Sequence, residues 1–215
     1  MVRVCAIYGS ESGNSERRIK ALTKDWPASL GFSRKTDLMS GNEAAARGLA
    51  SLAKAYDVVV VATSSYGDGD PPDNFTKFLA ALYAAEGEPL AGVQHCVLGF
   101  GSTDYETFQN NPRLTDKLLG ERGSRRMLAR VEVDENETLA GDAAVAKFAV
   151  DVVDALEAAA STKASPPACA WTEPEALILD KKDELLAAGA AGLPVPLLAT
   201  VAVAVAAAAA YAVFF

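Results

Sequence analysis

Two uninterrupted apolar runs, Tyr56–Thr63 and Gln94–Phe100, constrain the fold of this chain more than any other feature. A strand that is apolar at nearly every position must be covered by other elements on both faces. Strand-like and helix-like segments alternate around these runs from residue 3 to about residue 160. We expect strands over Arg3–Tyr8, Gly31–Leu38, Tyr56–Thr63, Gln94–Phe100 and Met127–Val133, and helices over Ser15–Trp26, Asn42–Lys54, Asn74–Ala85, Pro112–Arg122 and Leu139–Ala159. Five strand–helix pairs in this order predict an α/β fold with a doubly wound parallel sheet.

The composition argues against several classes of function. The chain has 28 Asp and Glu against 20 Lys and Arg, and its net charge of −8 argues against binding to nucleic acid. Its one histidine, His95, is too few for a histidine-ligated metal site or for most catalytic triads, so we expect it to be structural. Cys5, Cys96 and Cys169 are odd in number and far apart, which favours a reducing compartment without disulfides. Of these, Cys5 and Cys96 are expected to be small core residues.

A polar loop follows the first predicted strand, at the end where ligands bind in open α/β sheets. The loop Gly9–Glu16 offers three hydroxyl groups, one amide and two glycines at the start of a helix. Backbone N–H groups and the positive end of the helix dipole suit a phosphate monoester, and the hydroxyls can donate further hydrogen bonds. No lysine follows Gly13 and no GxGxxG is present, so this is neither a Walker loop nor a dinucleotide fingerprint. A serine-rich turn that only caps the helix is the alternative.

The loop after the third predicted strand, Ser64–Asn74, carries an aromatic residue beside a glycine. Tyr66 offers a flat face, and the peptide of Gly67 can change its orientation at little steric cost. The acidic residues of the loop do not follow the spacing of an EF-hand calcium loop. The alternative here is a solvated turn in which Asp73 or Asn74 caps the next helix.

The loop after the fourth predicted strand, Gly99–Phe108, supplies a second tyrosine, Tyr105. Two tyrosines from neighbouring strand ends can enclose a planar ring while the first loop holds its phosphate. The stretches YGSESGNSE, SYGDGDPPDNF and GFGSTDYETF resemble, in order and spacing, the three cofactor loops of the flavodoxin family. More narrowly, they are similar to the FMN domain of diflavin reductases, over roughly residues 3–158. The resemblance implies a flavodoxin-like five-stranded parallel sheet in the order 2-1-3-4-5, with FMN as the cofactor.

The resemblance also implies a role for individual residues. Tyr66 and Tyr105 would stack on the isoalloxazine ring, and the peptide of Gly67 would turn to accept a hydrogen bond from N5–H of the neutral semiquinone. The residues implied to bind the FMN phosphate are Ser10, Glu11, Ser12, Gly13, Asn14 and Ser15. Those implied to contact the ring or ribitol, or to lie in the same loops, are Ser64, Ser65, Asp68, Gly99, Gly101, Ser102, Asp104 and Phe108.

The sequence VDENET provides an acidic cluster, in which Asp134 and Glu135 are implied neighbours of the flavin edge. Two residues depart from the family pattern, since Ser12 replaces the commoner Thr and Glu135 stands where diflavin reductases have Asp. Both departures bear on the redox potential rather than on FMN binding. No catalytic residue and no metal ligand is expected.

The C-terminal part has a different composition. No charged residue follows Glu184, and Leu197–Phe215 is an apolar run whose helical length of roughly 28 Å matches the hydrocarbon core of a bilayer. We therefore expect a flavodoxin-like domain over 1–160, a linker or stalk over 161–193 and a transmembrane tail anchor over 194–215. The alternative for the tail is a buried Ala-rich helix or a segment of low complexity. An anchor here predicts a membrane protein whose flavin domain faces the cytosol, with the endoplasmic reticulum favoured.

These features together predict a membrane-anchored FMN electron carrier. Because the chain has no room for FAD and nicotinamide modules, a separate NAD(P)H-dependent flavin reductase is the expected donor. The expected acceptor is a haem, iron–sulfur or other protein with a basic docking face. Acidic residues that would make the flavin edge negative are Asp68, Asp70, Asp73, Asp104, Glu106, Asp134, Glu135 and Glu137. The alternatives are an FMN-dependent quinone reductase and a membrane adaptor of flavodoxin fold that binds no cofactor.

Overall fold

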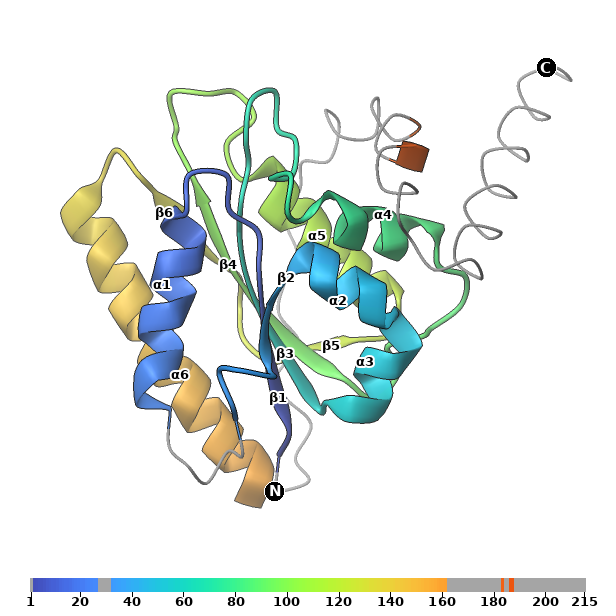
Figure 1. The fold of residues 1–215 in the computed structure, drawn as a ribbon. Coiled ribbons are helices and arrows are strands. Elements are labelled where there is room, and N and C mark those ends of the chain that lie inside the picture. Colours follow the sequence, from blue (N-terminus) through green and yellow to red (C-terminus); the bar gives the residue numbers. More distant parts are fainter. Residues whose placement is uncertain (1, 27–31, 162–182, 184–185, 188–215) are drawn as a thin grey trace, which may run out of the picture.

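A parallel sheet with helices on both faces forms the domain (Figure 1). The computed structural model describes residues 2–26, 32–161, 183 and 186–187. The strand order is β2-β1-β3-β4-β5, and a further strand, β6, also pairs with β4. The strands are β1 (Val4–Tyr8), β2 (Leu38–Ser40), β3 (Val58–Ser64), β4 (Gln94–Gly101), β5 (Arg125–Arg126) and β6 (Val131–Asp134). The expected parallel α/β sheet and its order 2-1-3-4-5 are thus confirmed.

Six α-helices and one short 3-10 helix cover the sheet within the described residues. They are α1 (Asn14–Leu22), η1 (Thr23–Asp25), α2 (Gly41–Arg47), α3 (Leu49–Ala55), α4 (Thr76–Ala84), α5 (Asn110–Glu121) and α6 (Thr138–Ser161). Helices α1 and α6 lie on one face, and α2, α3, α4 and α5 lie on the other (Figure 1). The carboxyl ends of β1, β3 and β4 meet at one edge, where the three polar loops emerge.

Alternate residues of the central strands fill two separate cores. On β3, Val58 and Val60 face the core beneath α1 and α6, whereas Val59 and Val61 face the core beneath the other helices. All four side chains are buried, as a strand covered on both faces requires. Cys5 and Cys96 lie in these cores as predicted, and burial raises the pKa of both thiols, so they are protonated at neutral pH.

Three predicted elements differ from the structure. The second strand was expected over Gly31–Leu38, but residues 34–37 form a turn, held by the Asp37 amide donating to Ser33 O at 2.7 Å, and β2 begins at Leu38. The single helix expected over Asn42–Lys54 is two helices, because Gly48 adopts φ 82° and interrupts the backbone hydrogen bonds between them.

The fifth strand, expected over Met127–Val133, is formed only from Val131 onward, and a separate two-residue strand, β5, precedes the expected range. Strand β5 pairs Arg126 with His95 of β4, and β6 pairs Val131 with Leu98 of the same strand. Between them Met127 is buried in the core and residues 127–130 leave the strand conformation. The break lies beside a network of buried ionic side chains.

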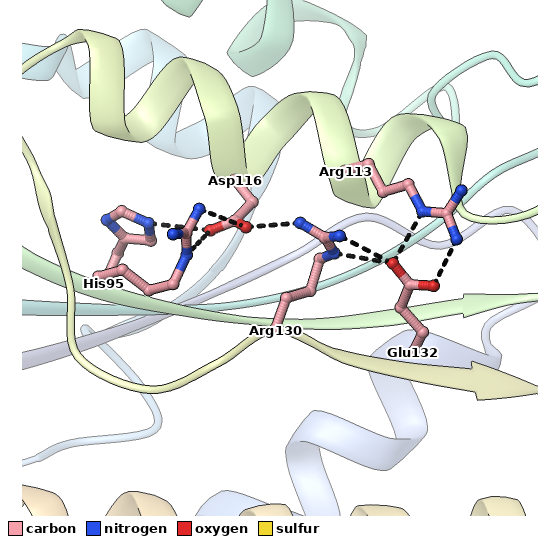
Figure 2. Close-up of polar contacts among 6 residues, drawn as sticks. His95, Arg113, Asp116, Arg130 and Glu132 are labelled. Carbon is pink, nitrogen blue, oxygen red and sulfur yellow. Dashed lines mark hydrogen bonds and ion pairs between the residues drawn. The ribbon is translucent and has the colours of Figure 1, made fainter. Parts of the chain in front are cut away.

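Asp116 of α5 is the centre of this network (Figure 2). Its carboxylate is 1% exposed and accepts hydrogen bonds from Arg126 Nε at 2.8 Å and Arg130 Nη1 at 2.6 Å. His95 Nε2 lies 3.1 Å from the same carboxylate, so the lone histidine is a buried structural residue as expected. Two arginines from either side of the strand break therefore bind one carboxylate on the helix that covers it.

Acid should destabilise the domain through Asp116. Burial alone would raise its pKa, but the hydrogen bonds from His95 and Arg126 outweigh burial, and the pKa of Asp116 lies below the usual 3.8. A lowered pKa in the folded state gives stability that is present above pH 4 and lost as the pH falls through the folded-state pKa. We expect Asp116→Asn to cost about 3–5 kcal/mol at pH 7, because two guanidinium groups lose a buried partner. Urea unfolding between pH 3 and pH 7 measures both effects.

Asp57→Asn is the control, at a more exposed ion pair with Arg3. It should lower the free energy of unfolding far less, because solvent screens that pair.

The predicted membrane tail, 194–215, lies outside the described residues, as does most of the predicted stalk, 161–193. Within the part of the chain that the structure describes, no helix is both long enough and apolar enough to cross a bilayer. One residue of the predicted stalk is described in the core: Leu186 is 1% exposed and belongs to the apolar cluster on the α2–α5 face. At this point the chain therefore packs against the domain.

Candidate functional site

The three polar loops enclose a cleft of about 430 Å³ at the carboxyl edge of the sheet. Its lining combines small polar residues at one end with aromatic residues at the other. The lining residues are Glu11, Ser12, Asn14, Ser15, Ser64, Ser65, Tyr66, Gly67, Gly101, Ser102, Tyr105, Thr107, Phe108 and Glu135. All of them except Thr107 were predicted from the sequence.

The start of α1 forms the polar end of the cleft. Gly13 precedes the helix with φ 83°, a left-handed conformation that glycine adopts without strain, and no side chain caps the helix. The serine-rich cap considered as an alternative is therefore not what this loop forms. The Oγ of Ser15 is buried and has no hydrogen-bond partner among the described residues. Such a group costs free energy unless a ligand or water satisfies it, and it lies at a helix N-terminus that favours an anion.

The aromatic end of the cleft carries two exposed tyrosines. Tyr66 is 58% exposed and Tyr105 is 63% exposed, although most other large hydrophobic side chains of the described domain are covered. Tyr66 belongs to a tight turn in which its amide donates to Asp70 O at 2.9 Å. Exposed aromatic faces beside a cleft indicate a surface that is covered when a ligand or partner is bound.

Contacts of the second loop with the third loop and with the start of α5 hold the two tyrosines in their relative positions. Thr107 Oγ1 donates to the Gly67 carbonyl at 3.3 Å, and Asn111 Nδ2 donates to the Ser64 carbonyl at 2.9 Å. Neither Thr107 nor Asn111 was predicted as a site residue. Thr107 lies in the motif GFGSTDYETF, so its position in a cofactor loop was a signal that it belongs to the site, but nothing in the sequence pairs Thr107 with Gly67.

The first loop is attached to the second by the side chains of Asn74, considered above as a helix cap, and Glu11, implied above to bind the FMN phosphate. Asn74 Oδ1 accepts from the Ser10 amide at 2.9 Å, and Glu11 Oε2 accepts from the Asp73 amide at 3.0 Å. Helix α4 begins two residues after Asn74 without a side-chain cap, so the capping by Asp73 or Asn74 that was considered as the alternative does not occur. The Glu11 carboxylate is turned toward the second loop.

Six predicted site residues do not line the cleft: Ser10, Gly13, Asp68, Gly99, Asp104 and Asp134. Packing explains why residue 99 is a glycine, because a Cβ at this position would lie 2.0 Å from Gln109 Oε1. Asp134 lines a second cavity of about 360 Å³ that adjoins the first. Both cavities share Ser12, Asn14 and Glu135, and Asn14 Nδ2 donates a hydrogen bond to Glu135 Oε1 at 2.5 Å.

Asp134 ties the third loop to the end of β6. Its carboxylate accepts from Thr103 Oγ1 at 2.6 Å and from the Asn136 amide at 3.0 Å. These hydrogen bonds, that of Thr103 first, lower the pKa of Asp134. This carboxylate is therefore ionised at neutral pH and keeps a negative charge beside the cleft.

The sequence matches the family model described as Flavodoxin over residues 7–148. The chain belongs to the flavodoxin family. Two solved flavodoxins share the fold. A short-chain flavodoxin associated with a bacterial microcompartment has a TM-score of 0.58 at 20% identity, over 73% of this chain and 99% of that one. A Streptococcus pneumoniae flavodoxin has a TM-score of 0.56 at 23% identity, over 73% and 98%.

Several curated relatives are reductases and monooxygenases that are much longer than this chain. A self-sufficient cytochrome P450 monooxygenase of Exserohilum turcicum is 39% identical over 59% of this chain and 11% of its own length. The sulfite reductase flavoprotein alpha-component of Klebsiella pneumoniae is 30% identical over 75% and 25%. Methionine synthase reductase of Caenorhabditis elegans is 29% identical over 60% and 18%. The chain therefore spans a quarter or less of the length of these relatives.

These matches make the chain a flavodoxin-like FMN domain, homologous to electron-transfer flavoproteins. The cleft fits this cofactor at both ends. The start of α1 and the unpartnered hydroxyl of Ser15 suit a phosphate, and Tyr66 and Tyr105 suit a planar ring.

Ser15 offers a direct test of the phosphate end. Ser15→Ala should weaken FMN binding roughly 10- to 100-fold, because a hydrogen bond to a charged group contributes about 1.5–3 kcal/mol. Ser51→Ala, at an exposed position of α3, is the matched control and should bind FMN like the wild type. Quenching of FMN fluorescence during titration with the FMN-free protein measures both affinities. Equal affinities for the two variants would contradict the assignment of Ser15.

Proposed function

We propose that this protein is a membrane-anchored, FMN-dependent electron carrier. It takes electrons from a separate NAD(P)H-dependent flavin reductase and passes them singly to a haem, iron–sulfur or other acceptor. The observation that carries the proposal is the exposure of Tyr66 and Tyr105 at the mouth of the cleft. A ring held between them lies at the protein surface, where a partner protein can approach its edge.

Different residues of the cleft hold different parts of FMN. The start of α1 and Ser15 bind the phosphate, and the tyrosines fix the plane of the ring and exclude water from its faces. Thr107 of the third loop and Asn111 at the start of α5 both bind the second loop, so that both tyrosines meet the same ring. Bound FMN supplies the redox chemistry, because it can accept and release electrons one at a time.

A stepwise reduction tests the proposal. FMN-loaded protein, reduced anaerobically in small steps, should develop the long-wavelength absorbance of one-electron-reduced flavin before it bleaches. NADPH alone should leave the flavin oxidised until a separate flavin reductase is added. Direct oxidation of NAD(P)H without that reductase would favour a quinone reductase, and failure to bind FMN would favour a cofactor-free adaptor.

The charge around the cleft supports a partner with a basic docking face. Asp73, Asp104 and Glu106 are exposed on the two loops that carry the tyrosines, and Glu135 is exposed beside them. A concentration of negative charge accelerates the approach of a positively charged partner and loses its effect as salt screens it.

Reversing the charge of two of these exposed acidic residues should slow electron transfer. The double variant Asp73→Lys/Glu106→Lys should pass electrons from reduced flavin to a basic haem protein, such as cytochrome c, several-fold more slowly than the wild type at low salt. The difference between the two rates should shrink toward 0.5 M salt, where the Debye length is roughly 4 Å. Stopped-flow absorbance at the haem band measures the rate. The double variant Asp154→Lys/Glu157→Lys, at exposed positions toward the other end of α6, changes the net charge by the same amount and is the control. Electron-transfer rates that do not depend on the charge at Asp73 and Glu106 would contradict docking at this surface.

The apolar segment Leu197–Phe215 supports the membrane part of the proposal. Flotation with phospholipid vesicles tests it with the full chain. The wild type should float, whereas Val203→Arg/Ala207→Arg should stay in the dense fraction, since each charge at the centre of a span costs about 2.5–3.5 kcal/mol. Thr162→Arg/Ala164→Arg, which adds the same two charges in the predicted linker, is the control and should float. A tail variant that still floats would contradict an anchor in this segment.

A further inference from the structure

One side of the FMN cleft is backed by an ionic network that reaches it from the core. Phe108 lines the cleft and packs against the backbone of Gly101, where an added Cβ would lie 3.1 Å from Phe108 Cδ2. The guanidinium carbon of Arg113 lies 6.0 Å from the centre of the Phe108 ring. The ring of Phe108 is therefore bounded by the Gly101 backbone and by a cation one turn into α5.

Arg113 is itself held in place. Its Nε and Nη2 donate to the two carboxylate oxygens of Glu132 at 2.8 and 2.6 Å, a paired geometry that fixes the plane of the guanidinium. Glu132 also accepts from Arg130 Nε at 3.0 Å, and Arg130 donates to Asp116 at 2.6 Å. Figure 2 shows the resulting row of side chains, which runs from His95 to Arg113 along α5.

The row crosses the place where the fifth strand is broken. Arg130 stands at the end of the break and Glu132 lies on β6, so backbone pairing with β4 resumes only one residue after Arg130. The position of the Glu132 carboxylate, and with it that of Arg113, therefore depends on side-chain ion pairs as well as on the sheet. This links the core of the domain to the third loop.

We propose that Arg113 is a positioning residue for the FMN ring: held by Glu132, it fixes Phe108 and thereby the wall of the cleft next to Tyr105. Arg113 does not line the cleft, and it acts through Phe108. The inference rests on the proposed binding of FMN in this cleft. Because the cation over its face holds the Phe108 ring in place, removing that cation is expected to weaken FMN binding several-fold, up to roughly 30-fold.

The experiment compares two arginines of the same network. Arg113→Met removes the contact with Phe108, whereas Arg126→Met removes a partner of Asp116 at the far end. We expect Arg113→Met to weaken FMN binding about tenfold, or 1.4 kcal/mol, and Arg126→Met to change it less than about twofold although it lowers the stability of the fold. Arg113→Lys keeps the charge but not the paired geometry with Glu132, and it should restore binding only in part.

A double-mutant cycle separates positioning from a general loss of stability. In the Phe108→Leu background, Arg113→Met should change the FMN dissociation constant less than about twofold, because the residue through which it acts has been replaced. An undiminished tenfold effect in that background would overturn the proposal, and so would equal effects of Arg113→Met and Arg126→Met.

Hydrogen exchange of the FMN-free protein gives a reading that does not depend on the cofactor. The Phe108 amide donates to Tyr105 O at 3.0 Å, so its protection reports the order of the third loop. Arg113→Met should reduce this protection and Arg126→Met should not. If the wild type failed to bind FMN, the proposed function and the inference would both be overturned. Normal FMN binding by Arg113→Met, with unchanged protection of the Phe108 amide, would overturn the inference alone.

Discussion

Burial of β1, β3 and β4 on both faces is the constraint on which the rest of this structure depends. Because these strands are covered by two separate cores, their side chains are almost all apolar, and polar chemistry is confined to the strand ends. Parallel strands bring those ends to one edge of the sheet. The loops after β1, β3 and β4 therefore meet and form the cleft, although they are separated by tens of residues in the chain.

Turns within the loops and hydrogen bonds from one loop to neighbouring segments together shape the cleft. Asn74 and Glu11 connect the first loop to the second. Thr107 connects the second loop to the third, and Asn111 connects the second loop to α5. Asp134 connects the third loop to β6. Each bond joins segments that only the folded sheet brings together. An FMN domain needs this arrangement, because the phosphate and the ring of one cofactor must be bound by three different loops.

The elements that sequence reasoning placed best are those with strong apolar patterns. The central strands β3 and β4 were predicted to within two residues at each end, since few other arrangements bury such runs. The errors among the strands lie at the sheet edges. The β2 region is shortened by the turn that Asp37 stabilises, and the fifth strand is broken where Arg126 and Arg130 both turn toward Asp116. Tertiary ion pairing of this kind leaves no local pattern in the sequence.

The amino-acid sequence by itself determined the alternation of strands and helices, the three polar loops and the two tyrosines, because hydrophobic periodicity and loop chemistry are local properties. The tertiary structure alone decided which side chains act between loops. It turned Glu11 and Asn74 toward neighbouring loops, brought Thr107 to the Gly67 carbonyl, and placed Arg113 behind Phe108. These contacts join residues that are distant in the chain or on separate elements, so their energies exist only after the sheet has brought the loops together.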